Sequence, residues 1–358
     1  MSGKKAETVN KSNGSSAEKV RLFFRPSPSL FFHRFFFLLT LFFLPLISFA
    51  QLFLPIDDDP FGVPIYFNAD SIHRNKIKSI TANLQYKPDE HIIDDKGLKD
   101  YYQFDSLGRL VYYWRNKVKS YQTDVIDHPA VYRHGKRIKG ESTEFLNHYV
   151  YDTIFVNYYY DYKNRLSCRR ENDGDFFLTW YYIYNEDGTV ARKTHCRETN
   201  AGSSRVNFRL GMQTIISQED FSYQKFSATQ VKQLCLNDEG KPYKETMLLY
   251  DKQGRPIDSR EEYTSGGIRI VTTWQYDSLG RTKKLTYTSN AGDALDDNTE
   301  FNYDSLGRIE SVKRFHNSVL TDEFSYLYDG KTMVPHAYIN RRHVDLGIDI
   351  VKLDIVYY

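Results

Sequence analysis

Tyr276-Asp277-Ser278-Leu279-Gly280-Arg281 and Tyr303-Asp304-Ser305-Leu306-Gly307-Arg308 are two copies of one pattern, an aromatic residue followed by Asp-x-x-Gly-Arg. A third copy runs from Phe104 to Arg109, and a fourth runs from Tyr250 to Arg255. A recurring pattern of this kind indicates an array of supersecondary units that bury their apolar faces against one another. The repeat therefore predicts the fold before any other motif is considered.

Each copy has the chemistry of a tight β-hairpin turn. The aromatic residue ends a strand, the Asp side chain accepts backbone N–H groups, and Gly supplies the positive φ that the return requires. The copy at Tyr160 has Asn164 in place of Gly, and the copies at Tyr184 and Leu236 have Asn in place of Asp. Both exchanges preserve turn chemistry. We therefore interpret these residues as structural: Asp105, Gly108, Asp161, Asp251, Gly254, Asp277, Gly280, Asp304 and Gly307.

The spacing of the copies predicts the strand count. The aromatic residues of neighbouring copies are 24 to 27 residues apart, which is about two strands and two turns. The separations are 24 (160 to 184), 26 (250 to 276), 27 (276 to 303) and 25 (303 to 328). The gaps of 56 (104 to 160) and 52 (184 to 236) are near double periods, and we interpret 132–137 and 208–211 inside them as decayed copies. The step from Leu236 to Tyr250 is long enough for only one strand, so the turns on either side of that strand should lie at opposite ends of the sheet.

The repeat domain alternates between apolar and polar residues. Trp274 and Tyr276 share one strand face while Thr273 and Gln275 share the other, which is typical of half-buried antiparallel strands. A short helical turn capped by Asn68 and a first strand over 76–86 precede it. The sequence predicts an all-β fold, an antiparallel meander of repeated hairpins with about 16–20 strands, at ~13 residues per strand and turn. We expect one long twisted sheet or two sheets folded over an aromatic core, with 344–358 supplying capping strands.

Residues 1–50 form an N-terminal targeting segment. An apolar run from Phe35 to Ala50 follows a basic stretch, and the small residues Ser48 and Ala50 fit signal-peptidase cleavage before Gln51. The alternative is an uncleaved signal anchor, with membrane contact only through 31–50. Residues 51–100 then provide a leader and first strands, and 101–358 the repeat domain. We expect an exported protein of the periplasm, cell surface or medium, or one anchored through its N-terminal segment.

Composition and cysteine spacing exclude several function classes. Lys plus Arg number 48 and Asp plus Glu number 46, a net charge of +2 with no long basic block, so nucleic acid is not an expected partner. The three cysteines include no Cys-x-x-Cys pair. In a meander, Cys168 and Cys196 lie on strands separated by an intervening strand, too far apart for a disulfide. We expect buried free thiols, including Cys235, with no metal site and no cofactor.

No catalytic motif accompanies the repeat. The ten histidines form no His-Glu-x-x-His, and neither Gly-x-Ser-x-Gly nor a phosphate-binding Gly-rich loop occurs. His195 and Cys196 are adjacent in a strand, so their side chains point to opposite faces and form no dyad. The repeated loops also lack the Asp-x-Asp-x-Asp-Gly run of calcium sites. We predict that the chain is not an enzyme, and that each repeat Arg covers a neighbouring aromatic ring.

Clusters of Tyr and Trp provide the candidate ligand or partner face. The segment Phe176 to Tyr184 carries large side chains on both strand faces, so it is either sandwiched or has one exposed aromatic face. Rings of this kind can stack on sugars or bind a protein. The candidate residues are Trp114, Trp180, Tyr182 and Trp274, and the expected partner is an envelope protein or a glycan.

At these residues the chain resembles the YD-repeat family, also called Rhs repeats, whose units read Tyr-x-Tyr-Asp-x-x-Gly-Arg-Leu. The matching segments are 104–110, 250–255, 276–281 and 303–309, the last with Phe301 two residues before Tyr303, and the resemblance covers roughly 101–330. It implies a β-sheet fold outside the cytoplasm. Large members form shells around a C-terminal toxin, and others are cell-surface proteins proposed to bind carbohydrate. This chain has too few repeats to close such a shell and carries no recognisable autocleavage core or toxin domain, so we do not expect it to deliver a toxin.

The favoured function is a non-catalytic, exported YD-repeat protein that acts as a structural or protein-interaction scaffold in the cell envelope. The alternative is a carbohydrate-binding module that uses exposed Tyr and Trp side chains. An enzyme or a toxin-associated fragment is the least favoured interpretation.

Overall fold

The computed structural model describes residues 67–173, 176–202, 208–292, 295–330 and 334–358. All of them belong to one compact unit, Phe49–Tyr358. The predicted targeting segment and the leader through residue 66 lie outside the described residues.

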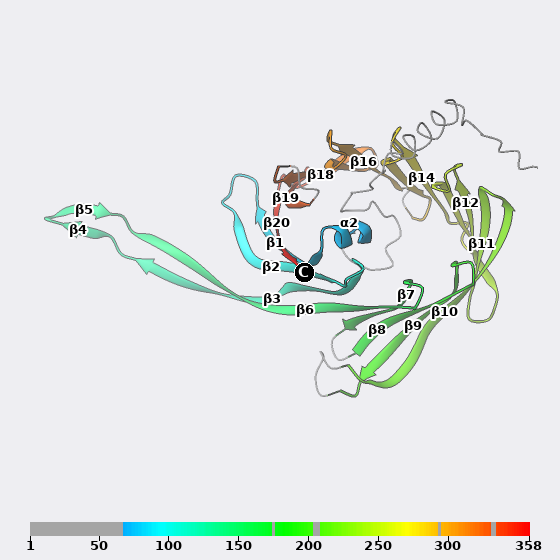
Figure 1. The fold of residues 1–358 in the computed structure, drawn as a ribbon. Helices are drawn as coiled ribbons and strands as arrows, with labels where there is room; N and C mark the ends of the chain where they lie inside the picture. The colour runs from blue at the N-terminus through cyan, green and yellow to red at the C-terminus, as the bar shows by residue number, and fades with distance from the viewer. Residues whose placement is uncertain (1–66, 174–175, 203–207, 293–294, 331–333) are drawn as a thin grey trace, which may run out of the picture. The chain divides into compact units, whose positions relative to one another are not determined.

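The described chain contains one short helix and twenty strands (Figure 1). The helix is α2 (Ala69–Arg74). The strands are β1 (Ile77–Lys87), β2 (Asp94–Phe104), β3 (Leu110–His128), β4 (Val131–Arg133), β5 (Lys136–Lys139), β6 (Ser142–Tyr160), β7 (Leu166–Asp173), β8 (Phe176–Tyr184), β9 (Val190–Asn200), β10 (Leu210–Ser227), β11 (Gln230–Leu236), β12 (Pro242–Tyr250), β13 (Pro256–Tyr263), β14 (Arg269–Tyr276), β15 (Thr282–Ser289), β16 (Leu295–Tyr303), β17 (Ile309–His316), β18 (Val319–Tyr328), β19 (Pro335–Arg342) and β20 (Ile348–Tyr357).

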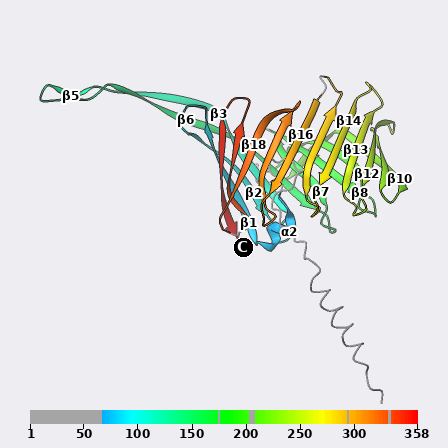
Figure 2. The ribbon, with the colours of Figure 1, turned by 90° about the horizontal axis from the view of Figure 1, so that it is seen from above.

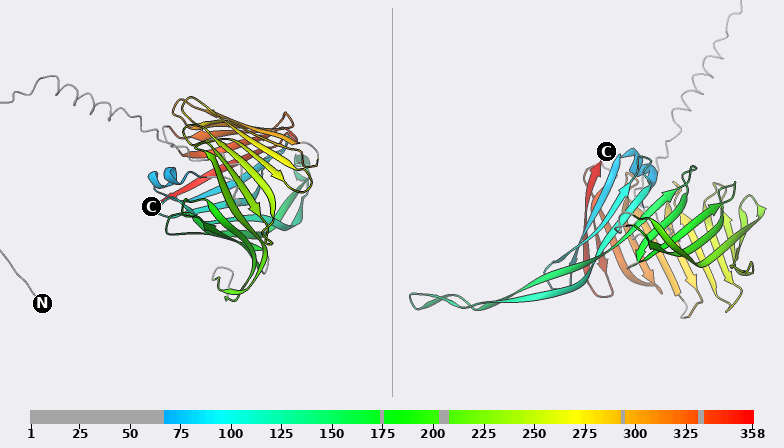
Figure 3. Two further views of the ribbon diagram at one scale, coloured as in Figure 1. Left: turned by 90° about the vertical axis from the view of Figure 1, so that its right-hand side faces the viewer. Right: turned by 90° about the horizontal axis from the view of Figure 1, so that it is seen from below.

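Eighteen of these strands form a single antiparallel sheet that closes on itself. Successive strands pair in chain order, with β3 pairing directly with β6, and β20 then pairs with both β19 and β1. At the seam Ile80 lies opposite Ile355 and Ala82 opposite Leu353. Figures 2 and 3 show the resulting ring of strands from three further directions.

Closure corrects part of the sequence prediction. The all-β antiparallel meander is confirmed, but the sheet is neither a long open ribbon nor two stacked sheets. The final strand does not cap an array, because it joins the last repeat to the first strand. Closure satisfies the backbone groups that two open edges would expose.

The repeat turns gather at one end of the ring. The turns that follow Phe104, Tyr160, Tyr184, Tyr250, Tyr276 and Tyr303 each join an even-numbered strand to the next strand. The turn after Leu236 joins β11 to β12 and so lies at the opposite end, as the short step from Leu236 to Tyr250 predicts.

The two expected decayed repeats are not repeat turns. Residues 132–137 form the β4–β5 tip of a long hairpin made by β3 and β6. Residues 208–211 lie where β10 begins, at the end of the sheet opposite the repeat turns. In both places an extended hairpin occupies the sequence length that a double period would need.

Helix α2 lies inside the ring of strands (Figure 1). Asn68 caps it as predicted, since its side-chain oxygen accepts a hydrogen bond from the backbone N–H of Ser71 at 3.1 Å. Ile72 is fully buried, and the Phe67 ring packs edge-on against Tyr102 and Phe104. We call the strand face that packs here the inner face. Its apolar cluster includes Ile80, Tyr102, Phe104, Val156, Phe301, Val312, Val351 and Leu353.

Two glycines in matching turns provide a test of how tightly α2 is held. Gly108 and Gly254 both have φ +78°, but a Cβ at Gly108 would lie 2.0 Å from the Ala69 carbonyl oxygen whereas one at Gly254 would meet nothing within 4 Å. Gly254→Ala is expected to cost about 1–2 kcal/mol through backbone strain alone. Gly108→Ala should cost a further ~1–3 kcal/mol, because the clash is with backbone of α2. Equal denaturant midpoints for the two variants would contradict the packing of α2 against this turn.

Candidate functional site

The repeat residues form a ladder of ion pairs and ring contacts along one end of the ring. In the Asp277 turn, Arg281 lies 2.6 Å from the Asp277 carboxylate, and its guanidinium lies 4.2 Å from the centre of the Tyr303 ring. The Tyr303 hydroxyl in turn donates to the carbonyl oxygen of Thr282. The Arg residues of the other Asp turns make the same contacts with the aromatic residue of a later repeat: Arg109 on Tyr160, Arg165 on Tyr184, Arg255 on Tyr276 and Arg308 on Tyr328.

These contacts give the repeat residues a structural role. The Asp277 carboxylate accepts the backbone N–H groups of Leu279 and Arg281 as well as the Arg281 side chain. Its pKa is lowered: burial raises it, but these hydrogen bonds and the Arg281 charge outweigh that effect. The prediction that Asp caps the turn and Arg covers a ring is confirmed. Each repeat is thereby coupled to a neighbouring repeat.

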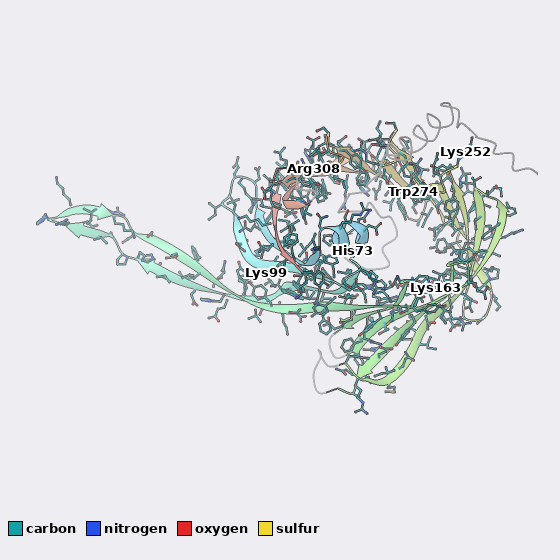
Figure 4. All side chains as sticks on the ribbon, viewed as in Figure 1. His73, Lys99, Lys163, Lys252, Trp274 and Arg308 are labelled. Carbon is teal, nitrogen blue, oxygen red and sulfur yellow. The ribbon has the colours of Figure 1, made fainter. Side chains whose placement is uncertain are left out.

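The four predicted face residues do not share one surface. Trp274 lies opposite Leu285, which packs on the inner-face cluster, and Tyr182 packs on that cluster directly. Trp180 is also on the inner face. It lies directly opposite Arg169 on β7, and Arg169 lies directly opposite Tyr158 on β6, which is buried in the inner-face cluster. Trp114 lies on the outer face, next to the buried inner residue Tyr113, and stacks on Tyr101. Figure 4 labels Trp274 and His73 of α2.

Trp180 is enclosed by its neighbours. Strand β7 contributes Arg169, whose guanidinium lies 4.4 Å from the indole, and β9 contributes His195, whose ring stacks on the indole at 4.4 Å with an interplanar angle of 7°. The two partners come from the strands on either side of β8, so the indole is held between them. Its outer-face neighbours Phe177 and Thr179 are also buried. Of the other residues in 176–184, Ile183 is exposed and the rest are half-buried, so the segment does not present one exposed aromatic face.

The cysteines lie where their spacing predicts. Cys168 is on β7 and Cys196 on β9, with β8 between them, and all three cysteines are buried free thiols. Burial raises the pKa of Cys168 to about 11. Cys196 lies opposite Thr179 while His195 lies opposite Trp180, so the two neighbours point to opposite faces of β9.

A buried polar cluster on the outer face was not predicted from the sequence. The Glu198 side chain is fully buried and accepts hydrogen bonds from Arg170 Nε (2.9 Å), Thr179 (2.7 Å), Tyr181 (2.6 Å) and Gln213 (2.8 Å). The Arg170 guanidinium also covers the Phe208 ring at 4.0 Å. The only signal in the sequence is that Glu198 lies two residues after Cys196, and so shares a face with a cysteine. The cluster is fully engaged with itself, which favours a structural role.

A long hairpin is the most exposed part of the described chain. We call residues 118–150 the arm. From Val118 to His128, β3 pairs only with β6, and no other strand pairs with this part of either one. The arm leaves the ring of strands (Figures 1 and 2). It exposes large apolar side chains, among them Tyr121, Val125 and Phe145, with Tyr121 66% and Phe145 65% exposed.

The outer face of β11–β18 is charged. Lys232 pairs with Glu245, Lys284 with Glu300 and Lys313 with Glu323, at N–O distances of 2.5, 3.0 and 3.3 Å. Among the described residues, no helix has the length and apolar character to cross a membrane. Within the same part of the chain, no group of three His, Cys, Asp or Glu side chains is arranged to hold a metal ion.

Comparison with known proteins gives similarity to solved structures alone. No family model and no curated protein matches the chain. A porin-like protein from Bacteroides uniformis is 12% identical, with a TM-score of 0.36 over 79% of this chain and 97% of that one. A porin-like protein from Bacteroides vulgatus is 10% identical, with a TM-score of 0.24 over 56% and 93%. The Photorhabdus luminescens Tc holotoxin pore is 11% identical, with a TM-score of 0.21 over 72% of this chain and 15% of that one. Similarities this distant establish no shared function.

Proposed function

We propose that the protein is a non-catalytic, exported scaffold of the cell envelope, built from YD-type repeats, and that the arm is its interaction element. The closed ring supplies a rigid base. The repeat Asp and Arg side chains are occupied in holding that ring together, as the Asp277–Arg281–Tyr303 contacts illustrate.

The arm carries this proposal. A two-stranded ribbon is marginally stable in water on its own, and the arm gains no further strand from the rest of the described chain. On one face of the arm, Val125 lies directly opposite Phe145, and Tyr121 lies four residues along the same strand. Exposed apolar side chains grouped on one face are typical of a binding site. A partner that covers Tyr121, Val125 and Phe145 would remove this surface from water.

The charged outer face favours an aqueous compartment of the envelope as the location of the ring of strands. A strand face that contacts acyl chains is apolar, and a Lys or Arg there costs about 2–4 kcal/mol at the bilayer midplane. The three Lys–Glu pairs on β11–β18 suit water instead.

The proposal predicts that binding to cell envelopes depends on the arm. Residues 51–358 contain every described strand, so this chain is the one to test. In the arm-shortened variant, Asn-Gly replaces residues 119–150 and joins Val118 to Tyr151, which are already directly opposite each other. The intact chain should sediment saturably with washed envelopes of the native host, and the variant should stay in the supernatant. Equal sedimentation of the two chains would reject the arm as the interaction element.

A further inference from the structure

The tip of the arm, residues 131–139, differs in charge from the rest of the arm. It contains Arg133, Lys136, Arg137 and Lys139 and no Asp or Glu, which gives a charge of +4 with His134 neutral. The remainder of the arm contains Lys119 against Asp124, Asp127, Glu141 and Glu144, which gives −3. Positive charge is therefore concentrated at the far end.

The four basic side chains of the tip repel one another. The tip is a separate two-stranded sheet, β4 with β5, in which Arg133 lies directly opposite Lys136. Like charges in directly opposite positions destabilise a strand pair. All residues of the tip are exposed, and none of these four side chains forms an ion pair within the described chain. An anionic partner would relieve this repulsion.

Apolar side chains lie among these charges. Val131, Tyr132 and Ile138 are exposed, Tyr132 by 63%, and Tyr132 lies directly opposite Arg137. Basic residues interleaved with apolar and aromatic ones suit the boundary between lipid headgroups and acyl chains, where Tyr can bury its ring and keep its hydroxyl in water.

The acidic residues behind the tip limit how deeply the arm could enter a membrane. Asp127 lies near the end of β3, just before the tip, and Glu141 lies between β5 and β6, just after it. Glu144 pairs with His128 next to them. Carboxylates at this position would be repelled by an anionic surface and penalised in hydrocarbon. The charge pattern thus fits a shallow contact by the tip alone.

We propose that the arm tip binds the surface of an anionic phospholipid bilayer, with Arg133, Lys136, Arg137 and Lys139 contacting headgroup phosphates and Tyr132 and Ile138 inserting at the interface. This inference rests on the proposed function, because the tip belongs to the arm that is proposed as the interaction element, and it names what the tip contacts. Electrostatic attraction at such a surface weakens with salt, since the Debye length falls from about 10 Å at 0.1 M to about 3 Å at 1 M.

The test is flotation of residues 51–358 with vesicles of phosphatidylcholine, alone or with phosphatidylglycerol. Three variants separate the contributions. In the tip-charge variant, Arg133, Lys136, Arg137 and Lys139 are changed to Ser; in the tip-apolar variant, Tyr132 and Ile138 are changed to Ser. The matched control changes four exposed lysines outside the arm to Ser: Lys78, Lys163, Lys252 and Lys283.

The intact chain and the control should float with phosphatidylglycerol vesicles, and with pure phosphatidylcholine far less. The tip-charge variant should bind at least about 100-fold more weakly, because each Lys or Arg near an anionic surface contributes about fivefold. The tip-apolar variant should bind about 10-fold more weakly and lose its remaining binding in high salt. The lipid assignment is overturned if the unmodified chain does not float, or if the control loses as much vesicle binding as the tip-charge variant. It is also overturned if the tip-apolar variant binds as well as the unmodified chain, because binding by charge alone would fit any polyanion.

The outcome is separable from that of the envelope experiment. Arm-dependent envelope binding without vesicle binding would overturn the lipid assignment and leave the scaffold proposal standing, with a protein as the partner. Vesicle binding by the tip without arm-dependent envelope binding would reject the arm as the interaction element of the scaffold and keep the lipid chemistry.

Discussion

A chain that ends at Gly347 is expected not to form the folded ring, although it lacks only the short segment 348–358. Strand β20 is hydrogen-bonded to β19 on one side and to β1 on the other, so its loss opens the sheet and creates two free edges. It also removes Val351 and Leu353 from the inner-face cluster, each worth about 1.5–3 kcal/mol of burial. Together these losses approach the whole stability of a typical domain, about 5–15 kcal/mol.

Far-UV circular dichroism, gel filtration and guanidinium unfolding measure this outcome. The truncated chain should aggregate through its exposed strand edges or unfold without a cooperative transition. The arm-shortened variant is the control, since it loses a longer segment, 119–150, and should keep a cooperative transition. Tyr358→Phe tests a contact just after β20, in which the hydroxyl donates to the carbonyl oxygen of Phe104 at the end of β2 at 2.6 Å, and should cost about 1 kcal/mol. A cooperative, monomeric chain without β20 would show that closure is dispensable.

Closure could not be predicted because it depends on pairing between distant segments that carry no repeat signature. The turns were predictable from Asp277, Gly280 and their equivalents, since turn chemistry is local. The seam joins Ile80, in the first strand, to Ile355, in the last one, and nothing in either segment specifies the other. A strand that is apolar on only one face is equally compatible with an open sheet, two packed sheets and a closed ring.

The arm was missed for a related reason. Tyr132 and Gly135 fall near the middle of the gap between the Phe104 and Tyr160 copies, where a decayed repeat and the tip of one long hairpin predict the same spacing. Only the charge pattern distinguishes a decayed repeat from a hairpin tip. A repeat turn uses Asp to accept backbone N–H groups, whereas the charged residues of 132–137 are Arg and Lys alone. The same ambiguity applied to residues 208–211, which were interpreted as the second decayed repeat. The Phe208 ring instead lies against Arg170.

The aromatic candidates show what composition can and cannot predict. Strand alternation predicted that Trp274 and Tyr276 share one face. The register places Trp274 opposite the inner-face residue Leu285, and an irregularity in the pairing follows between Gln275 and Tyr276. Alternation did not reveal that Arg169 and His195 would enclose Trp180, since these contacts arise from cross-strand register between three strands. A ligand-binding role for Trp114, Trp180, Tyr182 and Trp274 stays a prediction.

Glu198→Gln is expected to be the most destabilising single substitution in the outer-face cluster. Removing one partner of a buried ion pair typically costs about 3–5 kcal/mol, because the other charge is left buried and uncompensated. Here that charge is Arg170, whose side chain is only 11% exposed. Asp220→Asn is the matched control. Its pair with Arg192 has a similar geometry, at 2.5 Å, but the two side chains are 31% and 43% exposed, so water screens the pair and the cost should stay below about 1 kcal/mol.

The pH dependence of the Glu198→Gln effect provides a second readout. Burial raises the pKa of Glu198, but the hydrogen bonds from Tyr181, Thr179 and Arg170 outweigh it and leave the pKa below its usual 4.5. A carboxylate with a lowered folded-state pKa contributes stability that is fully present above the unfolded-state pKa and is lost as pH falls through the folded-state pKa. The free-energy difference between the native chain and Glu198→Gln should therefore be constant near neutral pH and shrink below about pH 4. If the free-energy difference between the native chain and Glu198→Gln does not change with pH, the substitution acts through packing. In that case the double substitution Arg170→Met with Glu198→Met should be no more stable than Glu198→Gln.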